Sequence, residues 1–184
     1  MIAGFKVHSI VFECSIPSDD RGRILFDLAE TKNASGIIAL GMASDKRGLC
    51  VESVTRNIIN NPKYCPDLEG KPVDSGFAYG EELALDLTPW NIDLFVEECC
   101  RKNVPVEKLS QDAGGFCCNH LMFQVEAFQR TRGLHQRIPF VYVHIPCSAQ
   151  AIVDSRAHSR SGKVLLPTYK VVKGLKILLE LSRL

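Results

Sequence analysis

The sequence has little net charge, a single tryptophan and no long apolar run. Its 184 residues include 22 Lys and Arg against 21 Asp and Glu, which leaves a formal net charge of +1. This balance favours neither nucleic acid nor an anionic membrane as a partner. No apolar stretch approaches the ~20 residues of a membrane span, and residues 1–11 lack the charged, apolar and small-residue order of a signal peptide. We therefore expect a cytoplasmic protein that binds neither nucleic acid nor a membrane.

Cysteine is abundant, but the spacings typical of disulfide scaffolds are missing. The eight cysteines include two adjacent pairs, Cys99-Cys100 and Cys117-Cys118, and no Cys-x-x-Cys occurs. Because 46% of the residues are hydrophobic, the chain can build a core without disulfides. We therefore expect reduced, mostly buried thiols in one globular domain that spans residues 1–184.

The spacing of four cysteine and histidine residues is compatible with one metal site. Two residues separate Cys117 from His120, and two separate His144 from Cys147. Thiolate and imidazole are the ligands of structural zinc sites, so these four side chains form a candidate zinc centre. In the alternative interpretation, Cys117 packs as an apolar side chain on the buried face of a helix.

The order of apolar segments predicts an α/β fold. Short apolar runs of strand type alternate with segments of helical periodicity, which is typical of β-α-β units and a parallel sheet. The strands are expected at Lys6 to Cys14, Gly36 to Gly41, Cys50 to Ile59 and Val106 to Leu109, and the helices from Asp19, from Thr88 to Cys100 and from Thr168 to Leu184. Ligands of such folds gather at the carboxyl ends of the strands, where Gly41 and Met42 are expected.

The segment Ser110 to His120 reads as a tight turn that runs into a helix. Gly114 and Gly115 permit a sharp bend, and from Phe116 onward the apolar residues have helical spacing. Cys117 and Cys118 are thereby placed in the first turn of the helix. Backbone N–H groups are unpaired there and the helix dipole favours negative charge, so a thiol at this point ionises more readily than one in a loop.

The segment Phe140 to Pro146 reads as a buried strand that ends in a histidine. It is continuously apolar or aromatic up to His144 and stops at a proline. An activated thiol and an imidazole at a strand end are the first two components of a cysteine hydrolase.

These segments resemble the pyroglutamyl peptidase I family, cysteine peptidases that remove N-terminal pyroglutamate. The resemblance runs from about Ser15 to the C-terminal helix. It rests on four motifs in the same order as in the family: Leu40 to Ser44, Cys50-Val51-Glu52-Ser53-Val54-Thr55-Arg56-Asn57, Asp112-Ala113-Gly114-(x)3-Cys118-Asn119 and Val143-His144-Ile145-Pro146.

The resemblance implies a fold and a mechanism. The fold would be a three-layer α/β/α sandwich around a mostly parallel, mixed sheet of the phosphorylase/hydrolase-like type. Cys118 would be the nucleophile, His144 the base and Glu52 the third catalytic residue. The substrate would be a peptide with N-terminal pyroglutamate, no metal or organic cofactor would be required, and a homo-oligomer would be usual.

The chain also departs from the family pattern. It begins after the family's N-terminal strand and its Gly-Phe-x-Pro-Phe-Gly loop, which helps to form the ring pocket, and Met42 stands where many bacterial members have glutamine. The residues that bind the substrate are therefore unassigned, apart from Gly41 and Met42 near the expected pocket. Three explanations stay open: a different substrate, a truncated N-terminus, or a weakly active relative that serves as a binding or structural protein.

Overall fold

The computed structural model describes residues 6–11, 21–43, 45–59, 77–133, 137–147 and 165–182. In chain order its elements are α1 (Arg21–Thr31), β1 (Ile37–Met42), β2 (Cys50–Glu52), β3 (Val54–Ile59), β4 (Phe77–Ala84), the 3-10 helix η1 (Thr88–Trp90), α2 (Ile92–Arg101), α3 (Cys117–Arg132), β5 (Phe140–Ile145) and α5 (Thr168–Leu181). No helix in these ranges is both long enough and apolar enough to span a lipid bilayer.

The central sheet is mixed, as expected. Within the described residues it has three strands in the order β1-β5-β2, with β1 parallel and β2 antiparallel to β5. On the far side of β2, Leu49 and Glu52 form isolated parallel bridges with Val106 and Ser110. The predicted strand at Val106 to Leu109 is thus present only as these bridges. A separate antiparallel pair, β3 and β4, extends the molecule beside α3.

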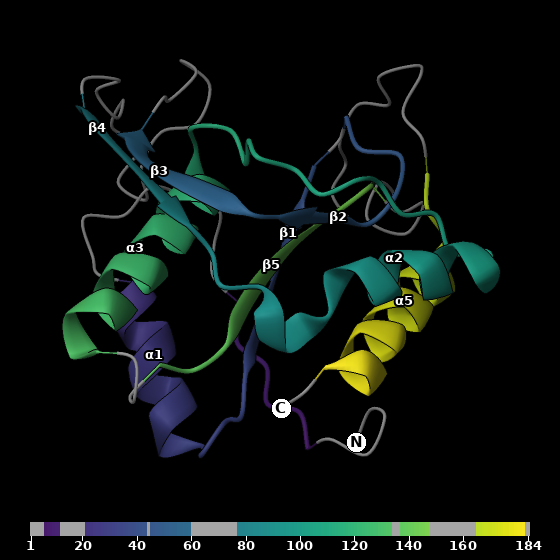
Figure 1. Cartoon of the computed structure of the whole chain (residues 1–184), viewed down its shortest axis with the longest axis horizontal. Coiled ribbons are helices and arrows are strands. Elements are labelled where there is room, and N and C mark those ends of the chain that lie inside the picture. Colours follow the sequence, from purple (N-terminus) through teal and green to yellow (C-terminus); the bar gives the residue numbers. More distant parts are fainter. Residues whose placement is uncertain are drawn as a thin grey trace.

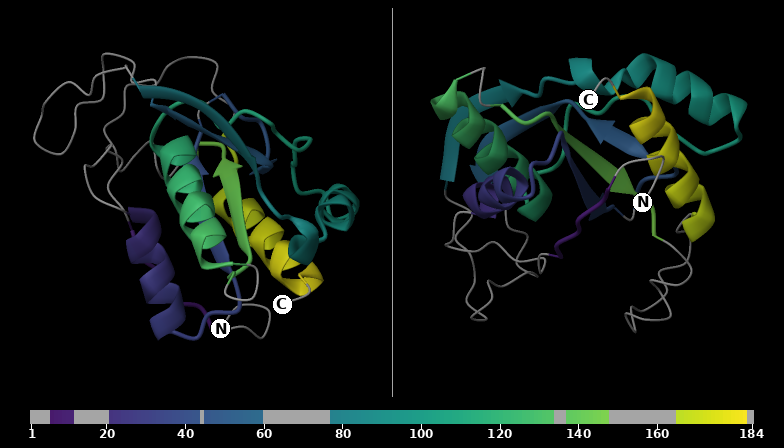
Figure 2. Two further views of the ribbon diagram at one scale, coloured as in Figure 1. Left: turned by 60° about the vertical axis from the view of Figure 1, so that its left-hand side comes forward. Right: turned by 90° about the horizontal axis from the view of Figure 1, so that it is seen from below.

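Helices cover both faces of the sheet. Figures 1 and 2 show α1 and α3 on one side and α2 and α5 on the other. The α2 and α5 side packs around Trp90, Phe95 and the β5 residues Val141 and Val143. The opposite side contains apolar residues of α1, α3 and the sheet, namely Leu25, Ala29, Ile37, Leu85, Met122, Val125, Phe140 and Tyr142. The predicted three-layer α/β/α sandwich is confirmed.

Two predicted strands are wrong in part. Residues 6–11, the described part of the strand predicted at Lys6 to Cys14, are exposed and have no strand structure. The strand predicted over Cys50 to Ile59 is broken at Ser53 into β2 and β3. Ser53 changes partners there, because its N–H donates to Ser110 O at 2.8 Å while its carbonyl accepts the Leu85 N–H at 2.9 Å.

Two helices also differ from their predicted bounds. The helix expected from Thr88 to Cys100 is divided by Asn91, whose φ of 48° lies in the left-handed region and separates η1 from α2. It ends, as expected, just before Asn103, which also has positive φ. The closing helix ends at Leu181 rather than Leu184. The start of the first helix at Asp19 lies outside the described residues.

Candidate active site

The register of the central sheet gathers the predicted site residues on one face. Gly41 of β1 lies opposite His144 of β5 in the parallel pair, and Cys50 of β2 lies opposite His144 in the antiparallel pair. Because side chains alternate along a strand, Glu52, two residues after Cys50, points to the same face. This is the face that α3 covers (Figure 2).

His144 and Glu52 form a buried pair. The His144 Nδ1 and Glu52 Oε1 atoms are 2.6 Å apart, and the exposed fractions of the two residues are 5% and 0%. Burial by itself lowers the pKa of His144, but hydrogen bonds with Cys118 and Glu52 outweigh it and raise the pKa to about 9. The imidazole therefore carries a proton at neutral pH. The carboxylate orients the ring and stabilises that charge.

Cys118 is the second residue of α3, as the sequence predicts. The preceding turn is closed by Asp112, whose Oδ1 accepts the Gly114 N–H at 3.0 Å. Gly114 has a φ of +74°, which explains the glycine at this position. Arg56 lies 3.3 Å from the same carboxylate oxygen and ties the turn to β3. The turn thus delivers the first turn of α3 to the end of β5.

Asn119 anchors this first turn and is 1% exposed. Its Oδ1 accepts the Arg56 N–H at 2.9 Å, and its Nδ2 donates to the Arg56 carbonyl at 2.8 Å. The Thr55 hydroxyl donates to the Asn119 carbonyl at 2.9 Å. The side chain next to Cys118 therefore pairs with β3 as a neighbouring strand would, and fixes the position of the thiol.

Gly41 lies directly beneath the thiol. A Cβ atom at this position would be 3.0 Å from Cys118 Sγ and would overlap the Tyr142 hydroxyl. The absence of a side chain therefore leaves the room that the sulfur occupies. Met42, the next residue, is 58% exposed at the end of β1. Both residues lie at the carboxyl end of β1.

The buried thiols differ from Cys118. The six cysteines in the described ranges form no disulfide with one another, and three of them, Cys50, Cys99 and Cys147, are buried. Burial raises the pKa of Cys50 to about 11 and that of Cys99 to about 12. These two thiols stay protonated at neutral pH, whereas Cys118 is hydrogen-bonded to the charged His144.

The zinc alternative is wrong. Cys117, His120, His144 and Cys147 all lie within the described ranges, and no group of three or more His, Cys, Asp or Glu side chains there could hold a metal ion. His120 instead lines a surface cavity with Phe123 and Gln124. His144 is engaged by Glu52.

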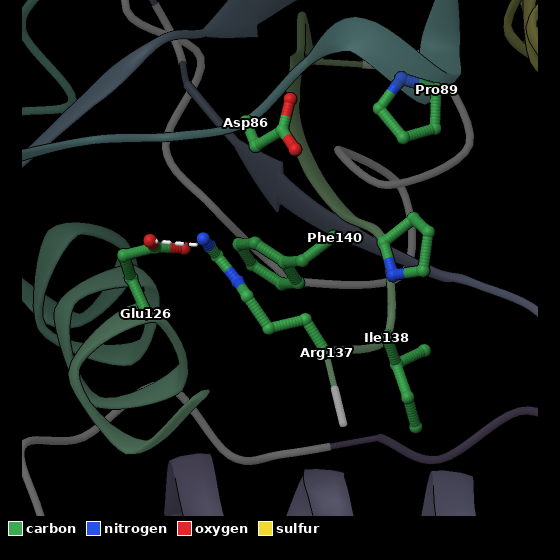
Figure 3. Close-up of a pocket in the computed structure, with 7 residues that line it drawn as sticks. Asp86, Pro89, Glu126, Arg137, Ile138 and Phe140 are labelled. Atoms are coloured by element: carbon green, nitrogen blue, oxygen red, sulfur yellow. Dashed lines mark hydrogen bonds and ion pairs between the residues drawn. The ribbon is translucent and has the colours of Figure 1, made fainter. Parts of the chain in front are cut away.

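A cavity of about 280 Å³ lies at the other end of β5. It is lined by Asp86, Pro89, Glu126, Arg137, Ile138, Pro139 and Phe140 (Figure 3). Phe140 begins the strand, whereas His144 stands near its end. Glu126 is 2% exposed and pairs with Arg137 and Arg130 at 2.5 and 2.9 Å. This cavity is separate from the cysteine and histidine, and its Glu126–Arg137 ion pair ties α3 to the segment before β5.

Two residues beside the site are not among the candidates that the sequence identifies. The sequence indicates Asn119 only as part of a motif, although its buried amide anchors the helix. Tyr142 lies two residues before His144, so the strand period of two places both side chains on one face. That period was a sufficient signal to add Tyr142 to the candidates.

Comparison with known proteins identifies the family. Residues 11–183 match the family model described as pyroglutamyl peptidase. Pyrrolidone-carboxylate peptidase 1 of Ralstonia nicotianae is 28% identical over 158 residues, which cover 86% of this chain and 69% of that protein. The pyrrolidone-carboxylate peptidase of Halalkalibacterium halodurans is 25% identical over 150 residues, covering 81% of this chain and 71% of that protein.

Solved structures share the fold. A mutant pyrrolidone carboxyl peptidase from Pyrococcus furiosus has a TM-score of 0.69 at 18% identity, covering 88% of this chain and 74% of its own. The Thermus thermophilus enzyme has a TM-score of 0.65 at 17% identity, covering 90% and 80%. The family match spans all four motifs. This chain therefore belongs to the pyroglutamyl peptidase family of cysteine hydrolases.

Proposed function

We propose that this protein removes pyroglutamate from the N-terminus of peptides, with Cys118 as nucleophile, His144 as general acid and base, and Glu52 as the residue that orients His144. The observation that carries the proposal is the continuous contact from sulfur to imidazole to buried carboxylate. Curated relatives named pyrrolidone-carboxylate peptidase support the choice of substrate.

The reaction begins from a charged pair. With its pKa raised to about 9, His144 is protonated at neutral pH. In the proposed reaction Cys118 acts as the thiolate beside this imidazolium. The sulfur attacks the carbonyl carbon that joins pyroglutamate to the next residue, forming a C–S bond. The C–N bond then breaks as His144 gives its proton to the leaving amine.

The second half of the reaction returns the enzyme to its starting state. His144, now neutral, accepts a proton from water, and the resulting hydroxide attacks the thioester carbon. The C–S bond breaks, pyroglutamate leaves as the free acid, and Cys118 is again a thiolate beside an imidazolium. Throughout, Glu52 accepts the Nδ1–H bond and keeps the opposite nitrogen directed at the sulfur.

The start of α3 supplies electrostatic stabilisation. Backbone N–H groups in the first turn have no intrahelical acceptor and point out of the helix end beside Cys118. They would hold the negative oxygen of each tetrahedral intermediate. No side chain with a fixed positive charge is needed for this role.

The substrate ring is neutral, so its recognition rests on shape and a few hydrogen bonds rather than on a buried charge. Gly41, at the end of β1 beside Cys118, is the described residue best placed to border the ring, and Met42 follows it at the exposed end of the strand.

The direct test is hydrolysis of a chromogenic pyroglutamyl amide, compared with the prolyl amide of equal ring size. We expect turnover of the first and none of the second, because the prolyl ring carries a charged amine. Cys118→Ala abolishes turnover, whereas the matched variant Cys117→Ala retains it. Equal rates for the intact protein and Cys118→Ala would reject the proposal.

A further inference from the structure

Tyr142 is a buried polar residue beside the thiol. It lies two residues before His144 on β5, is 3% exposed, and its ring meets that of His144 edge-on at a centroid distance of 5.1 Å. Its neighbours on this face of the sheet are apolar side chains such as Ile37 and Phe140. Phenylalanine would fill the same space without placing a hydroxyl on this face of the sheet.

The hydroxyl lies next to Cys118. The Tyr142 oxygen and the Cys118 sulfur both lie within 3.0 Å of the point where a Cβ atom on Gly41 would stand. Two atoms within that radius of one point are at most about 6 Å apart. A thiolate accepts hydrogen bonds at longer distances than oxygen does, because sulfur is the larger atom.

We propose that the Tyr142 hydroxyl donates a hydrogen bond to the Cys118 thiolate, as a second donor beside His144. The imidazolium approaches the sulfur from the end of β5, and the phenol approaches it over Gly41, from the floor of the site. A donor to the charged form stabilises thiolate relative to thiol. Tyr142 thereby helps to ionise the nucleophile and fixes the direction of its lone pairs.

The strength of the hydrogen bond changes with the charge of the sulfur during the reaction. In the acyl-enzyme the sulfur is a neutral thioester and accepts only weakly. When water attacks and the C–S bond breaks, the sulfur regains its charge, and the phenol stabilises it as the leaving group. The catalytic part of this inference rests on the proposed peptidase function, whereas the hydrogen bond to the thiolate does not.

The test measures the pH dependence of Cys118 alkylation by iodoacetamide, with the modified cysteine identified by peptide mass spectrometry. Tyr142→Phe removes only the hydroxyl. Since a hydrogen bond to a charged group is worth roughly a tenfold change in equilibrium, the acid limb of the alkylation profile moves up by about one pH unit. Below that pH, kcat/KM of the pyroglutamyl amide falls about tenfold.

A second variant should shift the acid limb of the alkylation profile in the opposite direction. 3-Fluorotyrosine placed at position 142 keeps the size of the side chain and makes the phenol a stronger donor, so the acid limb moves to lower pH. A purely structural role would not move the two variants in opposite directions. Tyr169→Phe, which alters an exposed tyrosine on α5, is the matched control and leaves the profile unchanged.

The outcomes separate this inference from the proposed function. Superimposable alkylation profiles for the intact protein and the fluorotyrosine variant overturn the inference, whether or not Tyr142→Phe folds. Opposite shifts support it even if the intact protein does not hydrolyse the pyroglutamyl amide, a result that rejects the peptidase proposal alone.

Discussion

Glu52 Oε1 lies 2.6 Å from His144 Nδ1, and this contact joins a three-residue strand to the end of a central strand. The other carboxylate oxygen, Oε2, is buried and has no hydrogen-bond partner among the described residues. A buried carboxylate is costly unless a charged partner compensates it. His144 is that partner, because its pKa is raised to about 9 and it is protonated at neutral pH.

Removing the charge of Glu52 should therefore weaken both the site and its pH response. We expect Glu52→Gln to lower kcat/KM about 10- to 100-fold, the loss of one hydrogen bond between charged groups. The pKa of His144 should fall toward its ordinary value. Steady-state kinetics from pH 6 to 10 measures both effects. An unchanged rate would mean that Glu52 does not orient His144.

The pH dependence follows from the sign of the His144 shift. Its folded-state pKa is raised from 6.5 to about 9, so folding favours the protonated form. This contribution to stability is fully present below about pH 6.5 and is lost as the pH rises through 9. The same proton serves the leaving amine, so kcat/KM should also fall through about pH 9. Urea unfolding of the intact protein and of His144→Gln checks the first effect, because the variant should lack that loss.

Gly41 leaves the space for the sulfur and the phenol. We expect Gly41→Ala to lower kcat/KM about 100-fold, because a displacement of about 1 Å at a reacting atom has effects of this size. Gly174→Ala is the matched control, since a Cβ there would collide with Leu49 in the core on the other face of the sheet. It should lower stability and leave the rate of the folded fraction intact. If both variants lose activity only in proportion to unfolding, Gly41 has no special role.

Asn119 should matter for stability as well as for the position of Cys118. Asn119→Ala leaves the N–H and carbonyl of Arg56 without their partners. The expected loss is about 2–4 kcal/mol in the free energy of unfolding. Urea denaturation measures this loss. The matched control is Asn57→Ala, which alters a half-buried asparagine next to Arg56 on β3. A loss no larger than that of the Asn57 variant would show that the amide is not an anchor.

Glu126 should affect the stability of the protein but not its activity. It lies on α3 eight residues after Cys118, about 12 Å along the helix, and pairs with Arg130 and Arg137. Glu126→Gln should cost about 1–3 kcal/mol of stability by weakening a buried ion pair. Its kcat/KM below the unfolding temperature should match that of the intact protein. A changed pH profile in this variant would contradict the separation of the two ends of β5.

The elements that carry the candidate site were predictable because their signals are local. The glycine turn before Cys118 and the apolar run that ends in His144 can each be recognised within about ten consecutive residues. Glu52 needed the family resemblance, since a strand glutamate is ordinarily solvated. The strand register brings Glu52 and His144 together once β2 and β5 share a sheet. Cys118 joins them because Asn119 holds the first turn of α3 against β3.

The errors have a common cause in contacts between distant segments. On α3 the buried residues include Asn119, Glu126 and Gln129, which a polarity pattern assigns to solvent. Each is buried because its partner lies elsewhere: Arg56 for Asn119, Arg137 for Glu126, and the Ile138 N–H for Gln129 at 2.8 Å. The break at Ser53 likewise depends on its hydrogen bonds with Ser110 and Leu85. The sequence of the strand itself contains no signal that predicts this break. The family resemblance assigns no role to Tyr142, so it did not predict this residue.

The nucleophile is tested most directly by trapping the acyl-enzyme. The protein is mixed with a pyroglutamyl ester, quenched in acid within the first turnovers, digested and analysed by mass spectrometry. We predict a mass increase of one pyroglutamyl group on Cys118, none on Cys117, and none at all in Cys118→Ala. A pyroglutamyl group on Cys117, or full turnover by Cys118→Ala, would contradict the assignment of Cys118 as the nucleophile.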